Sequence, residues 1–313
     1  MQHTTKRARY QQFCKQINAP IFIQAWYLDL VCRDGGSWDA AMVEEEGQLV
    51  GVMPYFYKSK YGFNYITMPI GAKYMGPYLL PEKNSLSDQH QLYEKLIKQL
   101  PNVDSFWQNF YPQCSNWLPF YWQGYRQTTR YTYRLNIADP DKVFRDLSDK
   151  TRYKLRKAKK IVAVVDDLPP EAFHRVHIMS FQRQKLPPPF SLETFLDIHK
   201  TLSQHDTGKM FFAVDEEQNI HSVLYVLLDG DTSYMHFLGS NPAFPKSESV
   251  NFLYWQVFQY LSKEKGIKWI DFQGGMMKNV ENIFRRFRAE QTPYFSITKE
   301  NSKLFKFIQY LKN

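Results

Sequence analysis

The residues with the clearest capacity for chemistry form a basic segment at positions 150–160. Seven of its residues are Lys or Arg, and none is acidic. A block of one sign attracts phosphates, so the segment predicts contact with a nucleotide, a coenzyme, RNA or an anionic lipid surface. Lys154 and Arg156 are its candidate phosphate-binding residues. The competing interpretation is a solvated helix face, which charge runs usually form.

A turn rich in glycine at positions 271–275 is a second candidate site, with the sequence Asp-Phe-Gln-Gly-Gly at the end of a predicted central strand. Glycines in that place let a ligand approach the backbone, so Gly274 and Gly275 are candidate donor-binding residues. Gln273 is a candidate catalytic residue because it can hold a water molecule there. The competing interpretation is a tight connection between a strand and a helix, and Asp271 is expected to be structural.

Histidines and cysteines offer fewer possibilities. His236 lies near the end of a predicted strand and is a candidate catalytic acid or base, although a packed core or edge histidine is the alternative. His174 and His177 stand one helical turn apart, but no third ligand accompanies them, so no metal is expected. An odd number of widely spaced cysteines predicts neither a disulfide framework nor a zinc site. They are Cys14, Cys32 and Cys114.

The first half of the chain predicts mixed α/β order. Apolar runs at 38–45 and 48–57 flank a Glu46-Gly47 turn and predict a β-hairpin. The spacing of apolar residues and the Pro and Gly positions predict the other elements. These are helices at 24–31 and 87–99 and strands at 64–69 and 103–110.

The second half predicts a similar order of elements. Leu155, Ala158 and Val162 are the only apolar stripe of the basic segment, so that helix should dock through them and expose its charges. The other expected helices lie at 141–147, 171–183, 192–202, 247–264 and 279–287. The expected strands lie at 127–136, 209–214, 222–228, 232–238, 268–272 and 294–298.

Length and composition limit the class of protein. A chain of 313 residues exceeds the usual size of a single core, so we predict an N-terminal domain at 1–130 and a C-terminal domain at 131–313. No apolar run approaches the roughly 18–20 residues of a membrane-spanning helix. The polar, basic N-terminus shows no secretory signal. We therefore expect a cytoplasmic protein without a membrane span.

Several segments resemble the FemAB-like branch of the GNAT acyltransferase superfamily. In the second half they are Tyr131–Asn136, Leu147–Lys159, Trp269–Met276 and Ile283–Phe287, and in the first half Gln24–Trp26 and Glu46–Tyr55. The resemblance implies an α/β fold with mixed sheets, in which two tandem GNAT-like domains pack across a cleft. The N-terminal domain would take the acceptor side, and the C-terminal domain would carry the acyl-transfer site.

The resemblance also implies where the donor binds. In GNAT enzymes two neighbouring parallel strands splay apart, and the exposed backbone between them holds the acyl donor. Here the strands at 232–238 and 268–272 would be that pair, and the helix from 247 would offer its N-terminus to donor phosphates. The implied phosphate-binding residues are Lys246, Ser247 and Arg286. Arg285 is the implied catalytic cation, and Asn241 is an implied substrate-binding residue. Tyr254, one turn along this helix, is a further candidate for substrate binding, although its spacing is also explained by core packing.

The sequence departs from the family pattern at two places. A coenzyme-A-binding GNAT carries a glycine-rich loop before the helix, whereas residues 241–248 read Asn-Pro-Ala-Phe-Pro-Lys-Ser-Glu. The prolines lack N–H groups and Glu248 repels phosphate, so acetyl-coenzyme A is expected to be a poor donor. Members that use aminoacyl-tRNA show Phe-Lys ahead of Phe-Gly. Phe284 and Arg288 stand at the lysine and glycine positions here.

The expected function is that of an N-acyltransferase. It would move an acyl or aminoacyl group from acyl-coenzyme A or aminoacyl-tRNA to the amine of a small molecule or peptide, such as a cell-wall or other peptide or lipid precursor. No metal cofactor is expected, tRNA is a candidate partner, and the sequence predicts no oligomeric state. The alternative is a non-catalytic GNAT-fold module that binds a phosphate-rich ligand such as RNA.

Overall fold

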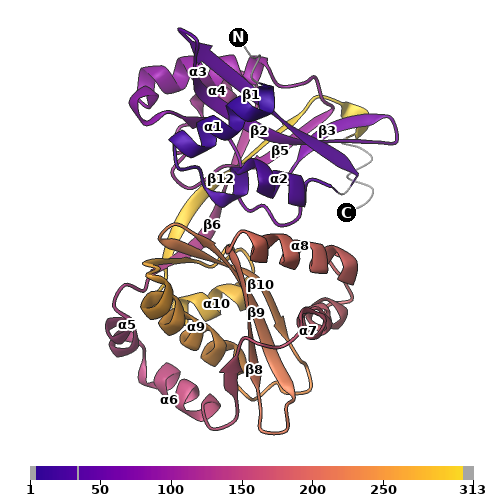
Figure 1. The fold of residues 1–313 in the computed structure, drawn as a ribbon. Coiled ribbons are helices and arrows are strands. Elements are labelled where there is room, and N and C mark those ends of the chain that lie inside the picture. Colours follow the sequence, from indigo (N-terminus) through magenta and orange to yellow (C-terminus); the bar gives the residue numbers. More distant parts are fainter. Residues whose placement is uncertain (1–4, 34, 306–313) are drawn as a thin grey trace. The chain divides into compact units, whose positions relative to one another are not determined.

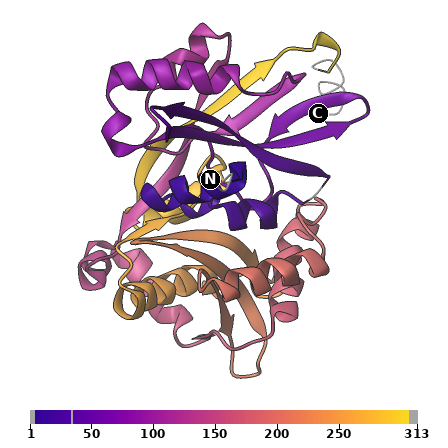
Figure 2. The same cartoon turned by 45° about the horizontal axis from the view of Figure 1, so that its top comes forward.

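The computed structural model describes residues 5–33 and 35–305 (Figures 1 and 2). Its contacts separate the chain into two compact units. The first comprises Met1–Arg130 together with the chain from Pro293 onward, and the second comprises Tyr131–Thr292. Both units mix helices with strands, as the sequence predicts.

The C-terminal strand corrects the boundaries expected from the sequence, which placed all of 131–313 in one domain. Strand β12 (Glu290–Glu300) pairs antiparallel with β5 (Ser105–Asn109) of the first unit. Phe110 N also donates to Phe295 O over 2.8 Å. These backbone hydrogen bonds make the last strand part of the first unit, although it follows the second unit in the sequence.

The sheet of the first unit has the order β1-β2-β3-β5-β12, with β4 paired to β2. The predicted hairpin is confirmed, because Glu46 and Gly47 connect β1 to β2 with positive φ angles of 51° and 79°, as a tight hairpin turn requires. The strands are β1 Gly36–Glu45, β2 Gln48–Lys60, β3 Phe63–Thr67 and β4 Tyr78–Leu79. The helices are α1 Lys6–Gln16, α2 Ala25–Val31, α3 Leu86–Lys98 and α4 Leu118–Trp122, with 3-10 turns at Ile21–Ile23 and Pro81–Lys83.

The sheet of the second unit has the order β6-β11-β10-β9-β8-β7. The pair β10 and β11 is parallel, and the other described pairs of this unit are antiparallel. The strands are β6 Arg126–Asn136, β7 Ala163–Val165, β8 Gly208–Val214, β9 Ile220–Asp229, β10 Thr232–Ser240 and β11 Trp269–Asp271. The helices are α5 Pro140–Asp146, α6 Asp149–Ala158, α7 Pro170–Arg183, α8 Leu192–Gln204, α9 Ser249–Lys265 and α10 Lys278–Arg286.

Helices cover both faces of this second sheet (Figure 1). Neighbouring residues on β8 show why, because Phe211 contacts Tyr260 of α9 while Phe212 contacts Phe173 of α7. Successive side chains of a strand point to opposite faces, so two adjacent buried aromatics require a layer on each side. Within the described residues, no helix combines the length and the apolar character that crossing a bilayer would require.

Candidate functional site

The parallel strands β10 and β11 diverge after three residue pairs. Their pairing ends at Tyr234↔Asp271, whereas β10 continues to Ser240 against β9. A β-bulge between Met235 and Phe237 accompanies the divergence and sets His236 out of the regular pairing with β9. The backbone pairing of β10 with β11 thus ends where the resemblance implies a splay, and we call this place the divergence.

Helix α7 supplies side chains to the edge of β10 at the divergence. Asn241 N donates to His221 O, so the backbone groups of Asn241 point toward β9. Backbone direction alternates along a strand, so the backbone groups of Leu238 and Ser240, three residues and one residue before Asn241, point to the opposite edge of β10. There His177 Nδ1 donates to Leu238 O over 3.1 Å, and Ser240 N donates to the Ser180 hydroxyl over 3.1 Å. Backbone groups that a donor could use are thus already bound within the chain.

The aromatic surroundings of His177 explain its charge state. Its ring stacks on Phe190 with centroids 5.5 Å apart and contacts Phe237 at 5.6 Å. Burial lowers the pKa of His177 to about 4, so the imidazole is neutral at pH 7. A neutral ring with one N–H suits the hydrogen bond to Leu238 O.

His236 and Gln273, both predicted catalytic residues, lie together at the divergence. His236 Nδ1 is 3.1 Å from Gln273 Oε1. Burial lowers the pKa of His236 to about 4, which makes it a weak base at neutral pH. The Nε2 atom of Gln273 is buried and has no hydrogen-bond partner within the described residues. The pair therefore leaves one buried amide donor unpaired among the described residues.

The turn after β11 is held by its acidic residue. Asp271 is 3% exposed, and its Oδ1 accepts hydrogen bonds from Thr132 Oγ1 over 2.6 Å and from Gln273 N over 2.7 Å. Gly275 has φ +149°, and a β-carbon there would lie 2.5 Å from the Tyr133 ring. The expectation that Asp271 is structural thus agrees with its contacts, and Gly275 serves close packing.

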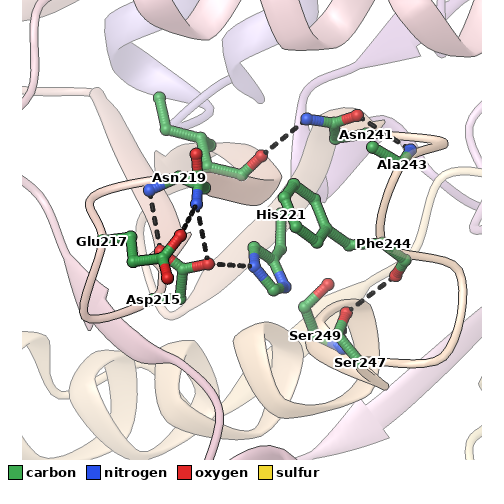
Figure 3. A network of polar contacts seen from close by, with 10 residues as sticks. Asp215, Glu217, Asn219, His221, Asn241, Ala243, Phe244, Ser247 and Ser249 are labelled. Carbon is green, nitrogen blue, oxygen red and sulfur yellow. Dashed lines mark hydrogen bonds and ion pairs between the residues drawn. The ribbon is translucent and has the colours of Figure 1, made fainter.

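A cavity of about 320 Å³ lies where the β10–α9 loop meets the N-terminus of α9. One wall is His221, which is 3% exposed, stacks on Phe244 at 3.9 Å and lies 2.9 Å from Asp215 through Nε2 (Figure 3). Hydrogen bonding from His221 lowers the pKa of Asp215 to about 2, so this carboxylate accepts the Nε2 proton. His221 Nδ1 is buried without a partner in the part of the chain that the structure describes.

The predicted residues of the β10–α9 loop fall into different places. Asn241 lines the cavity, but its side chain holds the loop by donating to Ile220 O and accepting from Ala243 N (Figure 3). Ser247 also lines the cavity, and its hydroxyl donates to Phe244 O over 3.0 Å. Lys246 is exposed and is not among the lining residues.

Tyr254 is a correction to the sequence-based expectation. It is 3% exposed and packs in the core between Phe258, Phe272 and Phe287, with ring centroids 5.4–6.2 Å apart. Burial raises the pKa of its hydroxyl well above the ordinary value. Its place on α9 therefore serves packing rather than substrate binding.

A carboxylate occupies the N-terminus of α9. Glu248 caps this helix in the left-handed conformation, forms an ion pair with Lys154 of α6 and accepts from Asn251 Nδ2 over 2.7 Å. Although burial acts to raise the pKa of Glu248, hydrogen bonding from Lys154 and the nearby charge of Arg286 hold it below the ordinary value. Lys154 and Arg286, two of the cations predicted to bind phosphate, thus already have an anion nearby.

The basic segment forms α6 as predicted, with Leu155, Ala158 and Val162 buried. Its exposed cations include Arg156, whereas Lys154 turns inward to Glu248. On α10, Arg285 forms an exposed ion pair with Glu281 through Nε at 3.3 Å. Glu281 Oε1 also accepts from Tyr133 OH over 3.2 Å, and the Tyr133 ring lies against Gly275, so these contacts link Arg285 to the turn after β11.

Metal ligation finds no support in the described residues, where no group of three or more His, Cys, Asp and Glu could hold an ion. His174, once paired with His177 as a candidate ligand, lies 3.3 Å from Phe190 O through its Nε2 atom. Both histidines contact backbone carbonyls of their own unit.

Two features of the site were missed from the sequence. Asp215 and His221 flank the turn between β8 and β9, and this hairpin spacing could have predicted their pairing. The bond from His177 to Leu238 joins residues 61 positions apart. No local signal in the sequence could have indicated it.

Comparison with known proteins finds one family model and several solved structures that resemble this chain. Residues 142–279 match the model described as an acetyltransferase (GNAT) domain. The crystal structure of FemX matches with a TM-score of 0.70 at 12% identity, over 99% of each chain. The sequence matches no curated protein.

Two further solved structures share the fold. L-PGS from Bacillus licheniformis has a TM-score of 0.57 at 9% identity, covering 97% of this chain and 94% of its own. A tandem GNAT protein from the clavulanic acid biosynthesis pathway has a TM-score of 0.57 at 9% identity, over 88% of each chain. These likenesses show a common fold.

Proposed function

Because the chain carries a GNAT acetyltransferase domain at residues 142–279 and shares its fold with FemX and a tandem GNAT protein, we propose that it is an N-acyltransferase of the FemAB-like kind. It moves an acyl or aminoacyl group from an activated donor to an amine. The observation that carries the proposal is the divergence of β10 and β11, with His236 and Gln273 beside it. The acceptor role of the first unit stays a prediction from the resemblance.

The chemistry needs few groups from the protein. The amine must be neutral to attack, and the acyl carbonyl oxygen gains negative charge that fixed hydrogen-bond donors can stabilise. The buried amide of Gln273 is such a donor. A neutral acceptor for the amine proton is also required, and neither His236 nor His177 carries a charge at pH 7. The surroundings favour transfer between uncharged groups.

The donor is an aminoacyl or longer acyl carrier rather than acetyl-coenzyme A. Three observations support this choice: His177 and Ser180 bind the edge of β10, Glu248 caps α9, and the loop before α9 contains two prolines without N–H groups. Each removes a group that would hold a pantetheine arm or a diphosphate. FemX and L-PGS, which share the fold, are reasons to test aminoacyl donors first.

The amine acceptor is a small molecule or a peptide, and a cell-wall or other peptide or lipid precursor is the class to try first. This class rests on the resemblance to FemAB-like proteins. Basic residues on the exposed face of α6 are suited to phosphates carried by the acceptor or the donor. We therefore also assign tRNA as a candidate partner of this face.

The experiment is a donor-consumption assay with the purified chain. Acetyl-coenzyme A, a long-chain acyl-coenzyme A and alanyl-tRNA are offered in parallel to a panel of amines that includes glycinamide and a lysine-containing peptide. Mass spectrometry detects new amides. Transfer from alanyl-tRNA or from the longer acyl donor supports the proposal. Rapid turnover of acetyl-coenzyme A overturns the choice of donor and spares the enzyme class.

A non-catalytic module is the second candidate function, and the solvated cations of α6 favour it. Lys150, Lys157 and Lys160 are among the exposed members of that face. A module would bind RNA or another phosphate-rich ligand stoichiometrically and consume no donor. Stable binding of tRNA without turnover of any donor would favour this function over transfer.

A further inference from the structure

Gln273 keeps a buried hydrogen-bond donor without a partner in the described residues. Buried polar groups in folded proteins almost always have a hydrogen-bond partner, so an unpaired one calls for an explanation. The remainder of the residue is fully engaged. Its backbone N–H donates to Asp271 Oδ1 over 2.7 Å, and its side-chain oxygen Oε1 lies 3.1 Å from His236 Nδ1. Only the Nε2 end of the amide is open.

His236 determines which end of the amide is open. An amide oxygen can only accept, so the imidazole proton lies on Nδ1 and is donated to Gln273 Oε1. Both N–H bonds of Nε2 then face away from His236. With burial lowering the pKa of His236 to about 4, the ring stays neutral at pH 7. It orients the amide without adding a charge.

The His236–Gln273 hydrogen bond spans the divergence. Tyr234 and Asp271 are the last paired residues of the parallel strands, and each partner of the bond lies two positions beyond one of them. A contact between side chains thus replaces the backbone ladder where it stops. The unpartnered Nε2 atom is thus carried by the residue two positions beyond the last paired residue of β11.

The backbone holds Gln273 in an unfavourable conformation. Its φ of +57° is left-handed, a conformation that non-glycine residues seldom adopt. Asp271 fixes this conformation, since it is anchored by Thr132 Oγ1 over 2.6 Å. Strain retained next to an unpaired buried donor is typical of a functional position.

We propose that Gln273 Nε2–H donates the hydrogen bond that stabilises the acyl carbonyl oxygen during transfer, and that His236 is the positioning residue that orients this amide. The inference rests on the proposed acyltransferase function. The amine nitrogen forms the new C–N bond while the carbonyl π pair moves to oxygen, where Gln273 donates. The C=O bond then re-forms, the bond to the leaving group breaks, and the proton lost by the amine goes to the leaving group.

Four single variants and one double variant test the two roles in steady-state assays with alanyl-tRNA and acetyl-coenzyme A. Gln273→Ala and Gln273→Glu remove the N–H donor and should lower kcat about 10²- to 10³-fold with little change in KM. His236→Leu should lower kcat less, and His236→Asn, which keeps an N–H near Nδ1, should restore most of it. Gln273→Ala combined with His236→Leu should be no slower than Gln273→Ala alone, because His236 acts through Gln273.

A matched control separates chemistry from backbone strain. Gln218 is also a glutamine in the left-handed conformation, with φ +65°, but it is exposed. Gln218→Ala should leave kcat unchanged. Thermal melting identifies a variant that fails to fold. If a variant fails to fold, ¹⁵N spectra of the wild-type histidines test the proposal instead, because it requires His236 to carry its proton on Nδ1.

The outcomes separate this inference from the function on which it rests. Wild-type protein that consumes neither of these donors nor a long-chain acyl-coenzyme A contradicts the acyltransferase function, and the role of Gln273 fails with it. Wild-type turnover with kcat retained within about twofold in folded Gln273→Ala and Gln273→Glu overturns the role of Gln273 alone. A neutral His236 protonated on Nε2 overturns the positioning role. Loss of kcat in both Gln273 variants, with His236→Asn active, supports the whole proposal.

Discussion

The divergence and the N-terminus of α9, both in the second unit, differ in whether their polar groups have partners within the chain. Gln273 leaves a buried N–H donor unpaired after bonding His236. Glu248, at the start of α9, binds Lys154 and Asn251 and has the charge of Arg286 nearby. The divergence therefore retains an unpaired hydrogen-bond donor, whereas the carboxylate at the N-terminus of α9 is paired with groups of the same chain.

This difference indicates which part of the donor each region can recognise. An unpaired donor in a buried setting favours a polar acyl oxygen, because the bond that forms there replaces nothing. A helix N-terminus ordinarily attracts phosphate, but a carboxylate at that place opposes it. We therefore expect the chain to select its donor by the acyl group and to gain little from a diphosphate at α9.

The largest effect is expected in the turn after β11, which carries Gln273. Gly275→Ala should lower the free energy of unfolding by about 3 kcal/mol and abolish turnover, because φ +149° and the Tyr133 ring at 2.5 Å leave no room for a β-carbon. Gly274→Ala is the matched control, since its β-carbon would meet nothing closer than 3.9 Å. Urea unfolding measures both changes, and equal losses in the two variants would contradict this account.

The second prediction concerns the neutral histidine beside the divergence. With the pKa of His177 lowered by burial to about 4, the unfolded chain binds more protons than the folded chain between pH 6.5 and 4. The free energy of unfolding should therefore fall as the pH falls through this window, by about 3 kcal/mol for this residue. His177→Asn, which keeps an N–H for Leu238 O, should flatten the slope, whereas His205→Asn at an exposed position should not. An unchanged slope in His177→Asn would place the pH dependence elsewhere.

The third prediction concerns the carboxylate at the N-terminus of α9. Glu248→Gln removes the carboxylate while keeping its shape, so Lys154 and Arg286 become available to a phosphate. Coenzyme A should bind about tenfold more tightly, the change that about 1.4 kcal/mol produces. Glu216→Gln, at an exposed position, controls for net charge. Calorimetric titration with coenzyme A gives both affinities, and equal affinity in wild type and Glu248→Gln would show that Glu248 does not exclude the diphosphate.

The smallest expected effect concerns the solvated face of α6. Arg156→Ala combined with Lys160→Ala should weaken tRNA binding several-fold and reduce its salt dependence, with the melting temperature nearly unchanged. Lys154 is left in place because its ion pair with Glu248 is partly buried. Lys263→Ala with Lys265→Ala removes the same charge from the exposed end of α9. If both double variants bind tRNA equally well across a salt series, α6 is only a solvated surface.

The sequence predicted elements whose signals are local. The Glu46-Gly47 turn specifies its hairpin through the backbone angles that such a turn needs, and Leu155 and Ala158 mark the docking face of α6 by helical spacing. His236 and Gln273 were singled out because His236 lies near the end of one predicted strand and Gln273 directly follows another. These inferences depend on neighbours in sequence, which propensity and spacing describe well.

Pairings between distant segments could not be predicted. Strand β12 follows the second unit in the sequence but pairs with β5. The residue types of β12 do not indicate which strand it pairs with. Tyr254 lies on a helix that is buried on several sides, so spacing could not tell its core face from a site face. The Lys154–Glu248 ion pair likewise joins residues 94 positions apart. Only the packing of α6 against α9 brings them together.

One measurement tests most directly the claim that the divergence transfers acyl groups while α9 excludes diphosphates. It is the ratio of kcat/KM for alanyl-tRNA to kcat/KM for acetyl-coenzyme A, with the same amine acceptor, in wild type and in Glu248→Gln. The account predicts a ratio above about ten in wild type, and a fall of about tenfold in Glu248→Gln as the phosphate site opens. A wild-type ratio below one, unchanged by Glu248→Gln, would contradict it.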